Sequence, residues 1–141
     1  MTAEAIEHVV VEADGGSRGN PGPAGYGAVV VDAQTGTVLA ERAESIGVNT
    51  NNVAEYSGLL AGLRAAAELG ARRVDVRMDS KLVVEQMSGR WQVKNPALRD
   101  LVRTAVSLRQ VFDDVTFTWV PREQNKRADK LANQAMDRAR G

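Results

Sequence analysis

The chain contains five segments in which apolar and polar residues alternate or β-branched residues run together. Glycine, proline and asparagine lie at the ends of these segments, and this pattern is typical of β-strands. We expect strands at residues 8–13, 28–31, 38–40 together with Ile46, 73–79 and 115–119. Short connections join the first three, so these strands are expected to pair antiparallel.

Four other segments carry apolar residues at three- and four-residue spacing, which predicts amphipathic helices. The first runs from Val53 to a stop at Gly70, the second is capped by Ser80, the third begins at Asn95-Pro96, and the last follows Pro121. Helical crossovers before the fourth and fifth strands predict that these strands run parallel. We therefore expect one α/β domain over residues 1–141: a mixed five-stranded sheet, with three antiparallel strands and then parallel strands, flanked by helices.

Residues 14–27, Asp-Gly-Gly-Ser-Arg-Gly-Asn-Pro-Gly-Pro-Ala-Gly-Tyr-Gly, separate the first two strands. Because glycine and proline disfavour a continuing ladder, we expect Asp14 to end its strand and a long loop to follow. A loop this rich in glycine would let a large ligand approach the backbone. The alternative is a flexible hairpin with a solvated aspartate.

The composition removes several kinds of site. Cysteine is absent, which excludes disulfides, thiolate zinc sites and cysteine nucleophiles. His8 is the single histidine, so a histidine-based zinc site is excluded and any metal must be held by oxygen. The first residues lack the features of a signal peptide, and no apolar run is long enough to span a bilayer. We expect a soluble, cytoplasmic protein.

The formal net charge is zero, but the charges are unevenly distributed. Acidic residues dominate residues 1–71, whereas basic residues dominate residues 72–109 and 121–141. This asymmetry is consistent with an acidic site beside a track that binds a polyanion. Charged helix surfaces that serve solubility alone explain it equally well.

Four carboxylates, Asp14, Glu55, Asp79 and Asp129, lie at predicted strand ends or helix starts. In an α/β fold such positions meet at one edge of the sheet. Taken singly, each also has a structural explanation, such as a helix cap or an interaction with a helix dipole. Four adjacent carboxylates would repel one another unless cations lie between them, and oxygen ligands suit Mg²⁺ or Mn²⁺. A pair of such ions supports in-line hydrolysis of a phosphodiester.

Four blocks of sequence resemble, in the same order, the signature blocks of type 1 ribonuclease H. They are residues 14–27, Thr50-Asn51-Asn52-Val53-Ala54-Glu55, Met78-Asp79-Ser80 and Asn125-Lys126-Arg127-Ala128-Asp129-Lys130-Leu131-Ala132. The resemblance covers essentially the whole chain. It implies a ribonuclease H-like fold and an endonuclease that cuts the RNA strand of an RNA/DNA hybrid, leaving 5′-phosphate and 3′-hydroxyl ends. The four carboxylates would be the catalytic ligands of two Mg²⁺ or Mn²⁺ ions.

The resemblance also implies which residues bind the hybrid. They are Gly15, Gly16, Ser17, Asn20, Thr50, Asn51, Asn52, Lys81 and Asn125. Asn20, Asn52 and the glycine-rich backbone would contact ribose 2′-hydroxyls across the minor groove. Thr50 and Asn51, at a helix start, would hold a phosphate of the DNA strand, although ordinary cap chemistry explains Asn51 equally well.

Asn125 would contact the RNA backbone near the cut. The partner implied is the RNA/DNA hybrid alone, without a membrane or a protein partner, and we expect a monomer.

The loop before the last helix departs from the usual family pattern. Many members carry a histidine there, thought to assist product release, whereas this chain has Pro121-Arg122-Glu123-Gln124. We hypothesise that Glu123 or Arg122 partly takes its place.

The chain also lacks the basic protrusion that many members insert between the middle helices. Arg90, Trp91 and Lys94 occupy that connection. They could form a reduced contact with the DNA strand, although packing of Trp91 at the helix junction is the favoured interpretation. Lys81 stands where glutamine is common, which would replace a hydrogen bond in the groove by a phosphate contact.

Two other functions fit the same residues. One is a nuclease or strand-transfer enzyme of the same architecture, such as a resolvase or transposase core, which usually lacks the Gly-Asn-Pro-Gly loop. The other is a non-catalytic module that binds hybrids, against which the four carboxylates speak because they repel phosphates. Cleavage assays on hybrid, double-stranded DNA and double-stranded RNA distinguish these functions.

Overall fold

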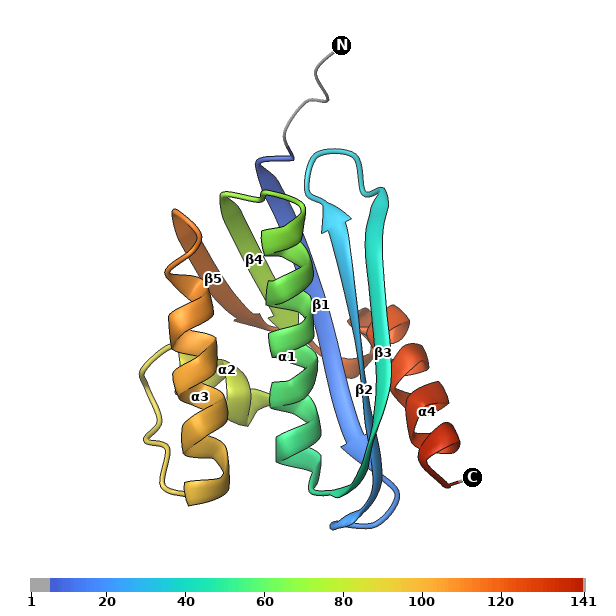
Figure 1. Ribbon diagram of the computed structural model, residues 1–141. Coiled ribbons are helices and arrows are strands. Elements are labelled where there is room, and N and C mark those ends of the chain that lie inside the picture. Colours follow the sequence, from blue (N-terminus) through green and yellow to red (C-terminus); the bar gives the residue numbers. More distant parts are fainter. Residues whose placement is uncertain (1–5, 141) are drawn as a thin grey trace.

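The computed structural model describes residues 6–140, which form a five-stranded sheet flanked by helices (Figure 1). The strands are β1 (His8–Ser17), β2 (Gly22–Asp32), β3 (Val38–Asn49), β4 (Arg73–Met78) and β5 (Asp114–Trp119). The helices are α1 (Asn51–Glu68), α2 (Lys81–Met87), α3 (Pro96–Arg109), the short 3-10 helix η1 (Arg122–Gln124) and α4 (Lys126–Arg140). Apart from η1, this order of elements is the predicted one.

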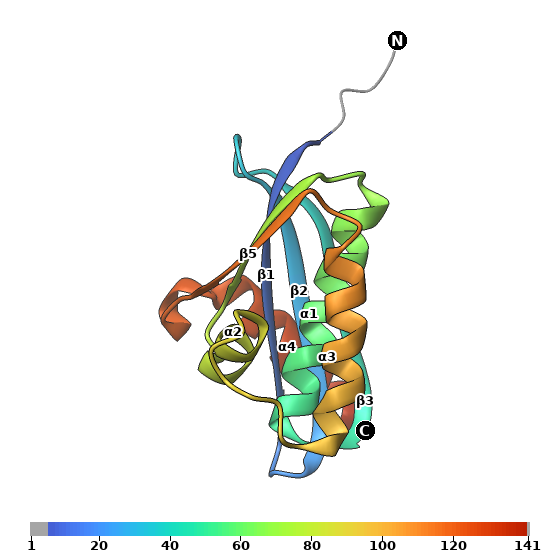
Figure 2. The ribbon, with the colours of Figure 1, turned by 90° about the vertical axis from the view of Figure 1, so that its left-hand side faces the viewer.

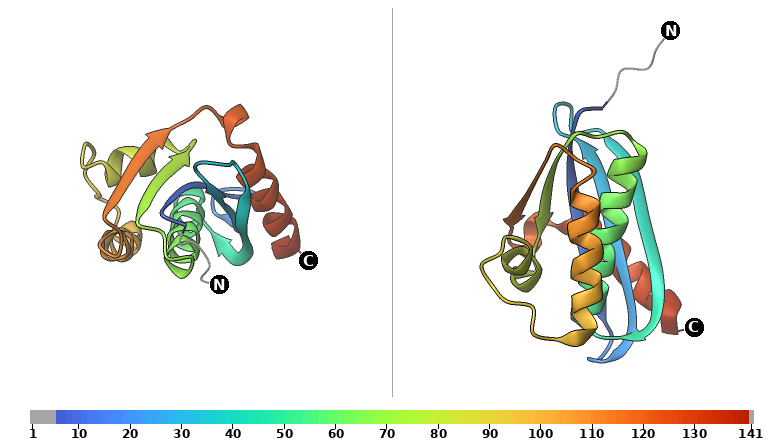
Figure 3. Two further views of the ribbon diagram at one scale, coloured as in Figure 1. Left: turned by 90° about the horizontal axis from the view of Figure 1, so that it is seen from above. Right: turned by 60° about the vertical axis from the view of Figure 1, so that its left-hand side comes forward.

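The sheet is mixed, as the sequence predicts, with strand order β3-β2-β1-β4-β5. β1 pairs antiparallel with β2 and β2 with β3, through short turns. β1 pairs parallel with β4 and β4 with β5, and these pairs need the helical crossovers α1 and α2–α3. β1 therefore lies at the centre of the sheet, as both views of Figure 3 allow the reader to follow.

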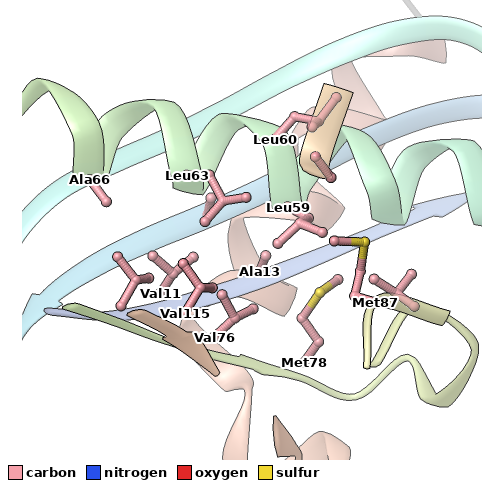
Figure 4. Packing of buried hydrophobic residues seen from close by; sticks show 14 of the residues in the cluster. Val11, Ala13, Leu59, Leu60, Leu63, Ala66, Val76, Met78, Met87 and Val115 are labelled. Carbon is pink, nitrogen blue, oxygen red and sulfur yellow. The ribbon is translucent and has the colours of Figure 1, made fainter. Parts of the chain in front are cut away.

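The main core lies between one face of the sheet and helices α1 and α3. Val9, Val11 and Ala13 of β1 alternate toward this face and are fully buried. Leu59 and Leu63 of α1 pack against them (Figure 4), and Figure 2 shows α1 and α3 side by side along the sheet.

Helix α4 packs on the opposite face, against β2, β3 and β1. Close approach is possible because β2 presents Gly25 and Gly27 there, where added Cβ atoms would lie 2.6 and 2.5 Å from α4 side chains. The two faces of the sheet thus hold the first and the last helix close to β1.

The glycine-rich stretch differs from its prediction. β1 does not end at Asp14 but continues through Gly15 and Gly16 to Ser17, paired with β2, and only residues 18–21 form the turn. The ladder continues because α1 passes directly over it: a Cβ at Gly15 would lie 2.3 Å from the carbonyl group of Ala54. The glycines therefore allow a close approach between two parts of the chain, and the expectation of a long loop is wrong.

The helix caps follow local sequence chemistry. Thr50, Ser80 and Asn95 each accept a hydrogen bond from a backbone N–H in the first turn of α1, α2 and α3. Because α1 already begins at Asn51, Glu55 lies beyond the first turn, which corrects the expected position. Within residues 6–140, no helix combines the length and apolar character needed to cross a membrane.

Candidate active site

The pairing of β1 with β4 brings the first two acidic residues together. Ala13 is the register partner of Met78 across this parallel pair, so Asp14 and Asp79, the next residues, lie side by side. Asp129 reaches the same place from the first turn of α4. These three carboxylates line one pocket, which confirms that they meet although they are far apart in sequence.

Glu55 comes from α1 and lies at the margin of this group. It is not among the residues that line the pocket. Its carboxylate interacts with the hydroxyl of Ser80 and with the charge of Asp79. Glu55 is therefore adjacent to the three aspartates but is oriented toward the start of α2.

The electrostatics of these carboxylates are those of a crowded acidic site. Burial, together with the charge of Asp79 and the hydrogen bond with Asp129, raises the pKa of Asp14 to about 8. Burial also raises the pKa of Glu55 to about 7, with a smaller contribution from Asp79, while the hydrogen bond with Ser80 opposes the shift. These raised pKa values mean that Asp14 and Glu55 are not both fully ionised at neutral pH.

The donor set fits a hard divalent cation, because it consists of carboxylate oxygens alone. Within the described chain, however, no three histidine or acidic side chains stand in a ready-made metal-binding arrangement. The groups that could hold ions are therefore Asp14, Asp79 and Asp129 around the pocket, with Glu55 beside Asp79.

Asn125 is hydrogen-bonded to a residue of this site. Its Nδ2 donates hydrogen bonds to the carbonyl of Ala13 at 2.9 Å and to Oδ1 of Asp79 at 3.1 Å. The residue has no exposed surface, so the expected direct contact with the RNA backbone is not available in this conformation. Instead, Asn125 holds Asp79 in position, and its Oδ1 is buried without a hydrogen-bond partner among residues 6–140.

The expected hybrid-binding residues join the β1–β2 hairpin to the start of α1. The backbone N–H and hydroxyl of Ser17 donate to Oδ1 of Asn51 at 2.8 and 3.0 Å, and the N–H of Asn51 donates to Oδ1 of Asn20 at 3.1 Å. Thr50 uses its hydroxyl to cap α1. The side chain of Asn51 thus joins the hairpin to α1, and Thr50 rather than Asn51 caps the helix.

These residues differ in how close they lie to the acidic pocket. Gly15, Gly16, Ser17 and Asn51 line it. Asn20, Thr50, Asn52 and Lys81 do not line it. Lys81 is exposed at the start of α2, one residue after Ser80.

Arg122 of η1 also lines the pocket and donates a hydrogen bond from Nη2 to Oδ1 of Asp129 at 3.2 Å. The nearby negative charges, Asp129 first, raise the pKa of this guanidinium. Glu123 is exposed and is not part of the pocket lining. Of the two residues suggested to replace the loop histidine, Arg122 is therefore the one beside the acidic group.

Several pocket residues were not identified from the sequence. Asn133 and Met136 follow Asp129 along one side of α4, and their three- and four-residue spacing is the signal that could have found them. Arg18 reaches the pocket from the hairpin. Trp119 at the end of β5 is half-exposed and donates from its indole N–H to the carbonyl of Asp79 at 3.2 Å.

Trp91, for which packing at the junction between α2 and α3 is the favoured interpretation, is 45 % exposed. Its neighbour Arg90 pairs with Glu85 of α2.

Known proteins resemble this chain over nearly its whole length. A family model described as reverse transcriptase-like matches residues 12–135. The Mycobacterium tuberculosis protein called bifunctional protein Rv2228c is 63 % identical over 131 residues, which cover 93 % of this chain and 36 % of that protein. Ribonuclease HI of Halobacterium salinarum is 48 % identical over 126 residues, covering 89 % of this chain and 63 % of its own length. Ribonuclease H of Hydrogenovibrio crunogenus is 34 % identical, covering 96 % of this chain and 100 % of its own length.

Solved structures give the same result. The N-terminal ribonuclease H domain of the M. tuberculosis protein has a TM-score of 0.93 and 62 % identity, covering 94 % of this chain and 96 % of that one. LC11-RNase H1 in complex with an RNA/DNA hybrid has a TM-score of 0.88 and 40 % identity, covering 94 % and 99 %. The chain spans about a third of the length of the first mycobacterial relatives. The sequence blocks, the mixed sheet and these comparisons together show that the chain belongs to the type 1 ribonuclease H family.

Proposed function

We propose that this chain is a metal-dependent endonuclease that hydrolyses the RNA strand of RNA/DNA hybrids by a two-metal-ion mechanism, giving 5′-phosphate and 3′-hydroxyl ends. The observation that carries the proposal is the meeting of Asp14, Asp79 and Asp129 in one pocket, where burial and mutual repulsion raise the pKa of Asp14. Relatives named ribonuclease H and a related structure bound to a hybrid support the substrate.

Asp14, Glu55, Asp79 and Asp129 would hold the ions, Mg²⁺ or Mn²⁺. When bound, such ions activate water for in-line attack on phosphorus and stabilise the leaving oxygen. The raised pKa values of Asp14 and Glu55 support this role, because a site built only for stability would not gather carboxylates that repel one another.

The chain's own residues set the geometry of this site. Asn125 fixes the carboxylate of Asp79 through Nδ2, and Trp119 holds the backbone carbonyl of Asp79. Together these hydrogen bonds restrict the side chain and the backbone of Asp79, which follows β4 and lines the pocket. A mobile Asp79 would weaken the ion site, so we assign both residues positioning roles.

Arg122 would act at the phosphate. Its guanidinium lies against Asp129 at the pocket. The planar guanidinium can donate hydrogen bonds from its N–H groups to phosphate oxygens. We propose that Arg122 assists departure of the product in place of the histidine that this loop lacks. Glu123 is exposed outside the pocket and takes no part.

Hybrid recognition would depend on the hairpin and the start of α1. The backbone of Gly15 and Gly16 and the polar groups of Ser17, Asn20 and Asn52 would face the minor groove, where 2′-hydroxyls distinguish RNA from DNA. The hydrogen bonds that join Ser17, Asn51 and Asn20 support this role because they fix the hairpin before the substrate binds.

A cleavage assay tests the proposal. End-labelled hybrid, double-stranded DNA and double-stranded RNA are incubated with and without Mg²⁺, beside an Asp79→Asn variant. Asparagine can still accept the hydrogen bond of Asn125, so a thermal melt should show that this variant folds. We expect the wild type to cut only the RNA strand of the hybrid, with Mg²⁺, and the variant to be inactive.

Three other results would each contradict the proposal. Binding of the hybrid without cleavage by the wild type would favour the non-catalytic module. Cutting of double-stranded DNA would favour a resolvase-like or transposase-like enzyme. Full activity of the Asp79→Asn variant would remove the carboxylates from the mechanism.

A further inference from the structure

Arg18 is placed at the edge of the acidic pocket by the turn that follows β1. It is one of the residues that line the pocket, together with Asp14, Asp79 and Asp129. Arg18 lies in the turn between β1 and β2, and its side chain contacts α4. The proposed function leaves this arginine without a role.

Two residues of α4 hold the guanidinium of Arg18. Its Nη2 donates to Oδ1 of Asn133 at 3.0 Å and to Oδ1 of Asp137 at 3.1 Å. The side chains of Arg18 and Asp137 are 40 % and 63 % exposed, and an ion pair this accessible contributes little to stability. The contact therefore orients the guanidinium more than it stabilises the fold.

The remaining donors of Arg18 are available to a ligand. Nε and Nη1 make no hydrogen bond within residues 6–140, so their N–H groups, on either side of the engaged Nη2, are still able to donate. A positively charged guanidinium with free N–H donors suits the negatively charged oxygens of a phosphate. In a pocket otherwise dominated by aspartates, such a group would attract a substrate anion rather than repel it.

The position of its partner Asp137 on α4 relates Arg18 to the site of cleavage. Asp129 and Asp137 are eight residues apart, which corresponds to roughly 12 Å along the helix axis. One strand of a duplex carries a phosphate about every 3.4 Å of axis. A strand whose reacting phosphate lies at the aspartates and which continues along the pocket toward the hairpin would thus bring a phosphate about three or four nucleotides away to Arg18.

We propose that Arg18 binds a backbone phosphate of the cleaved strand, within a few nucleotides of the cut, and that Asp137 and Asn133 hold it in the binding orientation. The inference rests on the proposed function, since it takes the pocket of the aspartates as the place of cleavage. It concerns the cleaved strand because Arg18 and the aspartates line the same pocket.

The test compares hybrid affinity among five forms of the protein, the parent and four variants, each in an Asp79→Asn background so that the hybrid stays intact. Arg18→Ala should weaken binding about three- to tenfold and reduce the slope of log affinity against log salt by roughly 0.7 to 0.9. Arg18→Lys should recover part of the affinity. Arg42→Ala is the matched control, because Arg42 is similarly exposed and pairs with an acidic residue, Glu68, outside the pocket.

Asp137→Asn separates phosphate binding from a purely structural contact. Asparagine can still accept the hydrogen bond of Arg18 but removes a negative charge beside the bound phosphate, so affinity should rise about twofold. If Arg18 only fastened the hairpin to α4, Asp137→Asn would keep that contact and leave the affinity unchanged or lower, and either result would overturn the inference.

Neutral methylphosphonate linkages locate the phosphate. One such linkage near the cut should weaken binding of the Arg18 form but have no further effect in Arg18→Ala, which a double-mutant cycle measures. Equal effects in both forms at every linkage would overturn the inference. Cleavage by the protein with Asp79 intact is measured in parallel: its absence would contradict the proposed function, whereas cleavage with an unchanged Arg18→Ala affinity would contradict only the role of Arg18.

Discussion

Replacing Asp14 by asparagine should stabilise the metal-free protein, and more so at higher pH. Burial, the charge of Asp79 and contact with Asp129 raise the pKa of Asp14 from 3.8 to about 8. Because the folded-state pKa is the higher one, ionisation opposes folding. The penalty is absent below the unfolded-state pKa, grows as the pH rises and is complete above the folded-state pKa.

The magnitude follows from this gap between the two pKa values. At full ionisation it corresponds to a ceiling of about 5 to 6 kcal/mol. Asparagine removes the charge but also loses the hydrogen bond that a protonated Asp14 makes to Asp129, so we expect a net gain of about 2 to 4 kcal/mol. The gain should be small near pH 5 and largest near pH 9.

Urea denaturation in EDTA at about pH 5, 7 and 9 measures this free energy of unfolding. Asp100→Asn serves as control, because Asp100 is exposed on α3 and its replacement should change stability little at any of these pH values. Excess Mg²⁺ should reduce the gain of Asp14→Asn, since bound cations relieve the repulsion. A gain that does not vary with pH, or a loss at high pH, would refute the electrostatic argument.

Three further predictions concern the neighbours of this group. Arg122→Ala should lower turnover at least about tenfold, whereas Glu123→Ala should leave it unchanged, as steady-state kinetics on the hybrid can show. Gly15→Ala should destabilise the fold by about 3 kcal/mol or more, since its Cβ would lie 2.3 Å from the backbone of α1. Gly16→Ala, whose Cβ would meet a flexible methionine at 3.3 Å, should fold normally but bind the hybrid less tightly. Asn125→Ala should cost about 2 to 3 kcal/mol and weaken Mg²⁺ binding, measurable by denaturation and by calorimetry; unchanged Mg²⁺ affinity would contradict its positioning role.

Most of the fold could be predicted because it is determined locally. Alternation in residues 73–79 gave the buried and exposed faces of β4, and the structure buries Val74, Val76 and Met78 as expected. Ser80 and the Asn95-Pro96 pair marked helix starts through cap chemistry that involves only the next few residues.

The errors in the fold arose where a distant segment decides local structure. Gly15 and Gly16 disfavour a strand by themselves, but they extend β1 because α1 and α4 pack closely against them. Nothing within residues 14–27 reveals that contact.

The acidic group itself was predictable from sequence order and family resemblance, whereas its surroundings were not. Asn125 was expected to reach the substrate, but the fold buries it beneath Asp79. Arg18 and Asn133 come together from opposite ends of the chain, and no spacing rule connects them. Such contacts depend on how α4 crosses the sheet, which is a property of the assembled fold.

Isothermal titration of Mg²⁺ into the protein, in buffers of different ionisation enthalpy, tests most directly whether the crowded carboxylates exist to hold divalent ions. Because Asp14 and Glu55 have pKa values of about 8 and about 7, Mg²⁺ binding near pH 7 should release roughly one proton, and much less near pH 9. The release should fall in Asp14→Asn. Mg²⁺ binding without proton release near pH 7, or with the same release in Asp14→Asn, would contradict the account.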